Sequence, residues 1–271
     1  MEVLLTWWND AYGFLLVFIS NLKLSSKLLV SSIRCVTQLT IMAIILRPIF
    51  LEKNPVYVFL VSGVMTLSGS IEVALLKSKF TYPGIFWVCL TSLIITNFCL
   101  AILGTGCIMG VQPFYDAQHF IPTFGMLVGN STSAVAISLS LLMKQLISEK
   151  EKIEMSLAFG ATRWEAAYPY IVEAIKIGML PTLNAMSVQG LVTIPGTDMT
   201  GQILGGVDPL DAVKYQHVIM FLIGSSTTLC SVFCCFATYY ILFDKQTHRL
   251  NYHKLQKQTS FSLSTITKKS N

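Results

Sequence analysis

The chain is poor in charged residues. Asp, Glu, Lys and Arg make up only 12% of its 271 residues, whereas 53% are apolar. A soluble domain carries about a quarter charged residues, so this composition excludes a soluble globule, and the apolar excess excludes a disordered chain. The alternating ten-residue segments of a membrane β-barrel are also missing. We therefore expect an all-α integral membrane protein, in the plasma membrane or an internal membrane.

The sequence also lacks the motifs of catalytic chemistry. It has no Gly-x-x-x-x-Gly-Lys-Ser/Thr phosphate-binding loop, and no Ser-His-Asp arrangement or pair of catalytic carboxylates stands out. The chain is thus predicted not to be an enzyme and to hold no cofactor of its own. An energy-coupled transporter would need ATP on a separate subunit.

Metal sites and nucleic-acid sites are only weakly indicated. The seven cysteines form no CxxC or zinc spacing, and the four histidines share no ligand spacing within a span. Met126, Met199 and the cysteines would suit soft ions, while Asp198 and Glu72 would suit harder ones, so the metal ligands stay unknown. The net charge of +5 comes from basic residues beside the predicted spans. This placement favours membrane lipid as a partner and no nucleic acid.

Seven long, nearly uncharged runs approach the roughly 20 apolar residues that a membrane-spanning helix needs. They are Val3–Leu22, Cys35–Phe50, Val56–Leu75, Gly84–Gly110, Thr123–Ile147, Ile175–Ile194 and Val218–Phe243. Residues 1–243 are therefore predicted to form one polytopic transmembrane domain. The polar, basic residues 244–271 are predicted to form a disordered tail.

The basic residues predict the orientation of these spans. With seven spans, sixteen of the 19 Lys and Arg residues fall on one side of the membrane. Because Lys and Arg accumulate in cytoplasmic loops, the amino terminus is predicted to lie outside and the carboxyl terminus in the cytosol.

The cytosolic connection at about residues 148–165 contains signals for two helices. Ser148 is followed three residues later by Glu151, and Thr162 by Glu165, so each pair has the pattern of a capping box. Gly160 lies where the first helix should end, because glycine readily adopts the left-handed turn.

These signals predict a short helix from about Glu149 to Phe159, a sharp turn, and a new helix near Arg163. A helix of about three turns is not stable alone in water. It should therefore dock through its apolar edge, formed by Ile153 and Leu157. An ordinary connector lying on the bilayer is the alternative.

Several sequence blocks carry a resemblance to known permeases. They are Glu154-Met-Ser-Leu-Ala-Phe-Gly160-Ala-Thr, then Gly190-Leu-Val-Thr-Ile-Pro-Gly196 with Met199-Thr-Gly-Gln-Ile-Leu-Gly-Gly206, then Pro209-Leu-Asp-Ala with Tyr215-Gln216, Gly125-Met-Leu-Val-Gly-Asn130, and Arg34 with Gln38-Leu39. The first resembles the coupling loop of ABC transporter permeases. Together the blocks resemble the UPF0014 family, which includes bacterial iron-export permeases and plant aluminium-sensitivity membrane proteins. The family usually has one residue between Pro-Gly and Met-Thr-Gly, whereas this chain has Thr197 and Asp198.

The resemblance implies a permease that works with a separate ABC ATPase subunit. In such permeases the short helix fits a groove on the ATPase, and the residues carried over to that contact are Glu154, Leu157, Ala158, Gly160 and Ala161. One chain offers one such helix, whereas an ABC motor has two ATPase subunits. We therefore expect a homodimer.

A glycine-rich segment near residues 190–206 is a candidate for the translocation pathway. Pro195 interrupts helix there, and irregular backbone at membrane depth is tolerated only inside protein or beside a watery cavity. The segment would line the pathway or form its external gate, and a plain extracellular loop is the alternative. Two polar residues inside other predicted spans, Glu72 and Asn130, are further candidates. The predicted pathway residues are therefore Glu72, Asn130, Pro195, Gly196, Asp198, Met199, Gly201 and Gln202.

The sequence leaves the transported solute open. The leading hypothesis is a permease that moves an iron-like metal ion or another small solute with the help of the ATPase. The alternatives are a metal channel or carrier that needs no ATPase, and an ABC-type nucleotide-sugar exporter involved in aluminium or metal tolerance.

Overall fold

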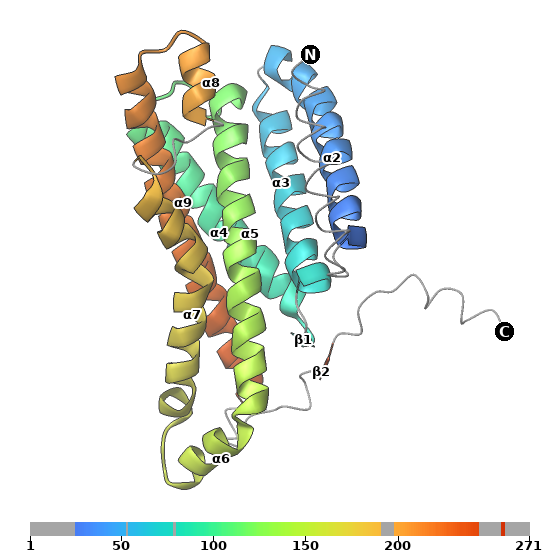
Figure 1. The fold of residues 1–271 in the computed structure, drawn as a ribbon, viewed down its shortest axis with the longest axis vertical. Helices are drawn as coiled ribbons and strands as arrows, with labels where there is room; N and C mark the ends of the chain where they lie inside the picture. Colours follow the sequence, from blue (N-terminus) through green and yellow to red (C-terminus); the bar gives the residue numbers. More distant parts are fainter. Residues whose placement is uncertain (1–24, 53, 78–79, 191–197, 244–255, 258–271) are drawn as a thin grey trace, which may run out of the picture. The chain divides into compact units, whose positions relative to one another are not determined.

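The computed structural model describes residues 25–52, 54–77, 80–190, 198–243 and 256–257 (Figure 1). The chain divides into two units, Met1–Asn54 and Pro55–Asn271. In the first unit the described element is α2 (Ser25–Glu52), with Pro48 near its end. The first predicted span, Val3–Leu22, lies outside the described residues.

The second unit is a helical bundle. Its elements are α3 (Pro55–Ile71), η1 (Glu72–Lys77), β1 (Phe80–Thr81), α4 (Ile85–Ile102), η2 (Leu103–Ile108), α5 (Ala117–Ser148), α6 (Lys150–Ala158), α7 (Arg163–Val188), α8 (Asp198–Leu204), α9 (Pro209–Leu242) and β2 (Gln256–Lys257). The π-helical turns η1 and η2 continue α3 and α4. Strands β1 and β2 form a two-residue antiparallel pair, with Phe80 opposite Lys257. Of the predicted tail, the structure describes only β2.

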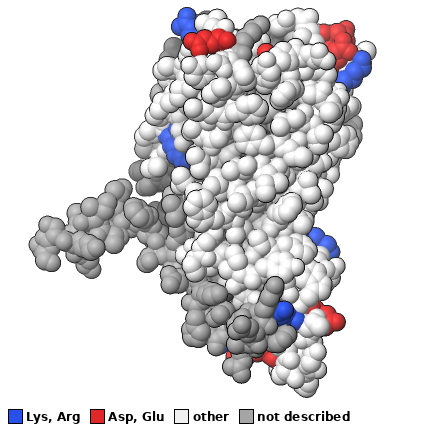
Figure 2. Space-filling model, turned by 180° about the vertical axis from the view of Figure 1, so that it is seen from behind, with Lys and Arg blue, Asp and Glu red and all other residues white. Residues whose placement is uncertain are grey.

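Six described helices are long and apolar enough to cross a membrane: Val30–Glu52, Pro55–Ala74, Ile85–Ile108, Ala117–Ser148, Arg163–Val188 and Pro209–Leu242. Each overlaps one predicted span. Figure 2 shows a broad uncharged surface, with Lys, Arg, Asp and Glu mostly towards its two ends. Large apolar side chains such as Trp87 and Tyr240 are exposed on the outside of the bundle. The predicted all-α membrane fold is thereby confirmed.

The apolar runs placed the starts of two membrane spans too late, although the capping signals correctly predicted a helix start near Arg163. Helix α7 begins at Arg163, twelve residues before the predicted Ile175, and α9 begins at Pro209, nine residues before Val218. The reason is capping. At α9, the Asp208 Oδ1 accepts the Leu210 backbone N–H at 2.8 Å, and Pro209 occupies the first helical position. A search for apolar residues alone misses these polar first turns.

Helix α5 is the centre of the second unit, because it contacts α3, α4, α7 and α9 (Figure 1). A buried cluster of hydrogen-bonded polar side chains links α4, α5 and α9. The Ser226 hydroxyl donates to the Asn97 Oδ1 at 2.5 Å, and the Ser131 hydroxyl lies 2.5 Å from that of Ser226. Such bonds join α4, α5 and α9 where apolar contact alone gives little specificity.

The largest apolar core fills the half of the bundle that lies towards α6. We call this region the packed half. Its buried side chains include Leu139, Leu142, Leu146, Ile171, Leu242 and the cysteines Cys89, Cys230, Cys234 and Cys235. These four cysteines are free and buried, and they fill the core as small apolar side chains.

Candidate functional site

Helix α6 joins the ends of α5 and α7, at the opposite end of these helices from α8 (Figure 1). The predicted short helix from Glu149 to Phe159 corresponds to α6, and the predicted second helix corresponds to α7. The connection therefore has the helix–turn–helix form that its sequence indicates.

The turn after α6 depends on Gly160. Its φ of +94° lies in the left-handed region. The Ala161 N–H donates to the Ser156 carbonyl, and the Gly160 N–H donates to the Leu157 carbonyl, both at 3.1 Å. This pair of bonds is a Schellman motif, which satisfies the last carbonyls of the helix. The prediction that Gly160 ends the first helix in a left-handed turn is confirmed.

Of the two predicted capping boxes, one forms. The Thr162 N–H donates to the Glu165 Oε2 at 2.8 Å, and the Glu165 N–H donates to the Thr162 Oγ1 at 3.3 Å. The box at Ser148 was wrong, because Ser148 ends α5 and its hydroxyl donates to the Gln145 carbonyl. Glu149 takes the N-cap position of α6, but its side chain makes no capping hydrogen bond.

The inner face of α6 docks on its own hairpin. Ile153 is only 1% exposed and belongs to the core of the packed half, and Leu157 packs against that core. Helix α6 contacts both α5 and α7. The predicted apolar edge thus fixes α6 to two membrane-spanning helices at once.

The outer face of α6 exposes a second apolar pair. Met155 is 58% exposed and Phe159 is 86% exposed. Charged residues surround them, with the Lys150 Nζ 3.9 Å from the Glu154 Oε1 and an ion pair between Lys152 and Glu149. The sequence prediction missed this pair. Met155 and Phe159 are four residues apart, and on a helix they lie about half a turn away from Ile153 and Leu157. This spacing is the signal of a second apolar face.

The residues carried over for ATPase contact gather at this tip. Glu154, Ala158 and Gly160 are exposed there, and Ala161 is partly buried. Leu157 faces the core of the hairpin instead. Leu157 therefore helps to hold α6 against the hairpin.

Three cavities follow α9 from Asp211 to Ile223, at the end of the bundle away from α6. The α8 cavity, of about 600 Å³, is lined by Gln118, His119, Pro122, Met126, Gly201, Gln202, Val207, Asp211 and Tyr215. The glutamine cavity, of about 210 Å³, is lined by Met186, Gln189, Gly190, Met199, Val213, Gln216, His217, Met220 and Phe221. The α7 cavity, of about 240 Å³, is lined by Asn130, Ser133, Ala134, Gly178, Pro181, Thr182, Ala185, Gln189, Met220 and Ile223. We call the region with these cavities the hollow half.

The cavities adjoin one another. Gln189 and Met220 line both the glutamine cavity and the α7 cavity. Helix α8 and the first turns of α9 line both the α8 cavity and the glutamine cavity. Twelve residues of helix rise by about 18 Å, so the series spans more than half of a typical hydrocarbon core.

The series ends at a close contact between α5 and α7. A Cβ placed on Gly178 would lie 1.8 Å from the Ser138 Oγ and 2.9 Å from the Ala134 carbonyl oxygen. Only glycine permits this approach of the two backbones. The packed half lies on the α6 side of this contact, so the Gly178–Ser138 contact marks the end of the cavity series nearest α6.

The structure brings four of the predicted pathway residues to these cavities. Asn130 lines the α7 cavity, Met199 the glutamine cavity, and Gly201 and Gln202 the α8 cavity. Asp198 starts α8.

The other predicted pathway residues lie elsewhere. Glu72 begins η1, is partly buried and lines none of the three cavities. Pro195 and Gly196 lie outside the described residues. The sequence prediction did not include Gln189, Gln216 or Gly178 among the pathway residues, although Gln216 is part of one of the blocks that carry the resemblance. The signal for the glutamines was an uncharged polar residue within an apolar run.

Within the described residues, no group of three or more His, Cys, Asp or Glu is placed to hold a metal ion. The His119 Nδ1 lies 2.6 Å from the Asp116 Oδ2, at the rim of the α8 cavity. The cavities are therefore lined mainly by uncharged polar groups, sulfur and apolar atoms, with His119 and Asp211 in the α8 cavity and His217 in the glutamine cavity.

Comparison with known proteins identifies the family. The sequence pattern of an uncharacterised protein family, UPF0014, matches residues 11–243. The UPF0014 membrane protein YjkA of Bacillus subtilis is 32% identical over 217 residues, which cover 80% of this chain and 84% of YjkA. Protein ALUMINUM SENSITIVE 3 of Arabidopsis thaliana is 30% identical over 243 residues, which cover 86% of this chain and 85% of that protein.

A third relative carries a functional name. FetB of Escherichia coli, named "Probable iron export permease protein", is 31% identical over 169 residues, which cover 60% of this chain and 64% of FetB. No solved structure matches the chain. The chain belongs to the UPF0014 family of multi-pass membrane proteins.

Proposed function

We propose that this chain is the permease subunit of an ATP-driven transporter, and that α6 docks on a separate ATPase subunit. The observation that carries the proposal is the exposed pair Met155 and Phe159 at the tip of the α5–α7 hairpin. Apolar side chains gathered on a polar surface mark sites of protein contact, and a charged rim around an apolar centre is typical of interfaces. The resemblance of this segment to ABC coupling loops supports the same assignment.

The attachment of α6 supplies a mechanism for coupling. Because the buried Ile153 fixes α6 to α5 and α7 together, a displacement of α6 would act on both helices. Those two helices meet again at the Gly178–Ser138 contact, which ends the cavity series. We infer that movement of α6 separates α5 from α7 at this contact and so connects the cavities to the cytosol.

The transported solute would be a metal ion or another small solute. The name of the relative FetB supports a metal ion. Two copies of the chain are proposed to assemble, because an ABC motor offers two ATPase subunits and one chain offers one α6.

The test is a charge placed in the apolar pair. The full-length chain is purified in mild detergent from membranes of its own cells, and bound proteins are identified by mass spectrometry. We expect an ATPase with a Gly-x-x-x-x-Gly-Lys-Ser/Thr loop to accompany the wild-type chain. Phe159→Glu should abolish this association without reducing membrane insertion, while the matched variant Phe159→Leu, which stays apolar, should retain most of it.

ATP-dependent solute movement in membrane vesicles completes the test. Flux that stops with Phe159→Glu and continues with Phe159→Leu supports the proposal. Flux that needs no ATP and is equal in both variants would instead identify an ATPase-independent carrier.

A further inference from the structure

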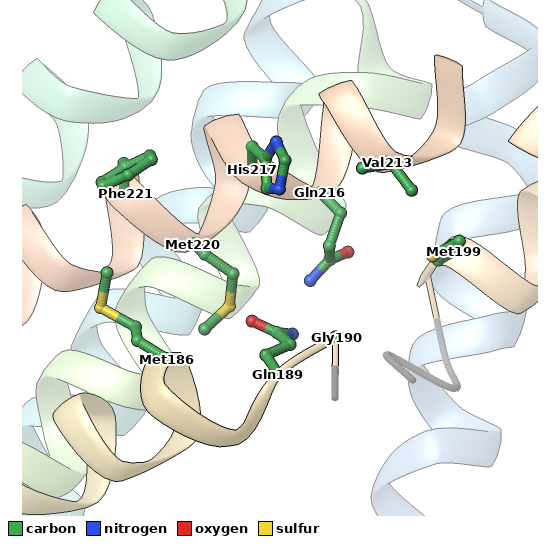
Figure 3. Close-up of a pocket in the computed structure, with 9 residues that line it drawn as sticks. All are labelled: Met186, Gln189, Gly190, Met199, Val213, Gln216, His217, Met220 and Phe221. Atoms are coloured by element: carbon green, nitrogen blue, oxygen red, sulfur yellow. The ribbon is translucent and has the colours of Figure 1, made fainter. Parts of the chain in front are cut away.

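Three methionines meet in the glutamine cavity. Met186 comes from the end of α7, Met199 from α8 and Met220 from α9, so three separate elements each direct a thioether to one space of about 210 Å³. Figure 3 shows Met186 and Met220 on one side of this space and Met199 on the other. Methionine in an ordinary core fills gaps, but here the side chains surround a cavity.

A buried oxygen without a partner points to a ligand in the same cavity. Gln216 is only 7% exposed, and its Oε1 has no hydrogen-bond partner among the described residues. Figure 3 shows the amides of Gln189 and Gln216 facing each other between the methionines. Because a buried acceptor left unpaired is unfavourable, this oxygen calls for a bound donor or cation.

The chemistry of the lining selects the kind of cation. Among its described residues there is no carboxylate and no cysteine, and the imidazole of His217 belongs to an exposed residue. Hard divalent ions prefer carboxylate, carbonyl and water oxygens, whereas thioether sulfur prefers soft ions such as Cu(I). A single positive charge also costs less to desolvate than a double one. A site without thiolate ligands binds more weakly, which suits an ion that must leave again.

We propose that the glutamine cavity is a transit site for a soft monovalent cation, Cu(I) in the first place. Met186, Met199 and Met220 supply the sulfur ligands, and the Gln216 side chain lines the same cavity. The inference rests on the permease function proposed above and names its substrate class. It also departs from iron, the metal in the name of the relative FetB.

The experiment uses Ag(I), which has the charge and softness of Cu(I) and needs no reductant. The full-length chain in detergent is labelled with ¹³C at the methionine methyl groups, and its accessible thiols are blocked with N-ethylmaleimide. We expect the methyl resonances of Met186, Met199 and Met220 to shift together and to saturate at one Ag(I) per chain. Met143, buried in the packed half, should not respond.

Conservative variants test the ligands. The double variant Met186→Leu/Met220→Leu keeps the side-chain volume and should lower the Ag(I) affinity of the cavity by at least tenfold. Gln216→Leu should lower it by a smaller factor. Met143→Leu is the matched control and should bind like the wild type. An unchanged thermal midpoint in each variant confirms that the fold is intact.

Two results would overturn the proposal. One is that none of the three resonances moves at Ag(I) concentrations that saturate free thioethers. The other is that Mn²⁺ or Fe²⁺ moves them at the same concentration as Ag(I). Binding is measured without ATP and without an ATPase. Failure of the test for ATPase docking therefore leaves the proposed cation site standing. Conversely, if the chain moves another solute with ATP but binds no Ag(I), the proposed cation is refuted while the permease function stands.

Discussion

The packed half and the hollow half of the bundle are built from the same helices, yet their interiors differ. Around α5, the half near α6 is filled by apolar side chains such as Leu142 and Ile171, whereas the half near α8 holds the three cavities. A close-packed interior transmits displacement as a unit, and a cavity with polar lining accepts water or a solute. We therefore infer that the packed half transmits displacement and that the hollow half accepts water or a solute.

The boundary between the halves is also informative. It lies where Gly178 meets Ser138, and about two helical turns nearer α8 along α5 the side chains of Asn97, Ser131 and Ser226 bond to one another. Small residues and hydroxyls allow two backbones to approach without interlocking large side chains. Such a contact suits a boundary that opens and closes more than a deep apolar core would.

The largest effect is expected from removing the attachment of α6 to the packed half. Ile153→Ala deletes a fully buried side chain, which should lower the free energy of unfolding by about 2–5 kcal/mol. Met155→Ala, on the outer face, should change it by less than about 0.5 kcal/mol. Thermal unfolding in detergent measures both. Equal losses would show that the two faces of α6 are not distinct.

A smaller but more specific effect is expected at the boundary. Gly178→Ala places a methyl group against the Ser138 Oγ and the Ala134 carbonyl, so it should destabilise the fold by about 1–3 kcal/mol. The companion change Ser138→Gly should restore part of this loss in the double variant.

Gly129→Ala is the control for this pair, because an added Cβ there meets nothing within 4 Å. The thermal midpoint of each variant provides the measurement. If Gly178→Ala and Gly129→Ala behave alike, α5 and α7 are not in close contact at the boundary.

The turn after α6 should respond in function more than in global stability. Gly160→Val forces a branched residue into φ +94°, at a local cost of about 1–3 kcal/mol. ATPase association and ATP-dependent flux should fall together while membrane insertion is kept. Gly63→Ala, in α3 and without a close neighbour, is the control. Normal flux by Gly160→Val would remove the coupling role of the turn.

The smallest effect on stability is expected for Glu154→Lys. Its ion pair with Lys150 is exposed, and such pairs contribute about 0–1 kcal/mol. A clear loss of ATPase binding in this variant would therefore report a contact with the partner. Retained binding and flux would remove Glu154 from the interface.

The sequence predicted the elements of the packed half well because their signals are local. Gly160, Thr162 and Glu165 form their turn and cap within a few residues, so short motifs reveal them. The failed box at Ser148 has an equally local cause, since α5 continues through that residue. The helix start at Arg163 was predicted from its capping box, whereas the start at Pro209 was missed because the apolar run begins later than its cap.

The hollow half could not be predicted in the same way. Gln189 and Gln216 are 27 positions apart, and only the packing of α7 against α9 brings them to one cavity. Gly178 gains its importance from Ser138 on another helix, which no spacing indicates. Polarity or a glycine-rich context did predict four residues that line the cavities: Asn130, Met199, Gly201 and Gln202. The same reasoning also predicted Glu72, which lines none of the three cavities.

The central claim is that a displacement of α6 opens the Gly178–Ser138 boundary. The direct test is the reactivity of Ser138→Cys towards a water-soluble maleimide, in a background where the exposed Cys35, Cys99 and Cys107 are serine. Ser138 is fully buried, so the thiol should be unreactive in the isolated chain. With the ATPase and ATP its labelling rate should rise at least tenfold, while the buried Cys234 stays unlabelled. A thiol at position 138 that stays unreactive during ATP-dependent flux would contradict the account.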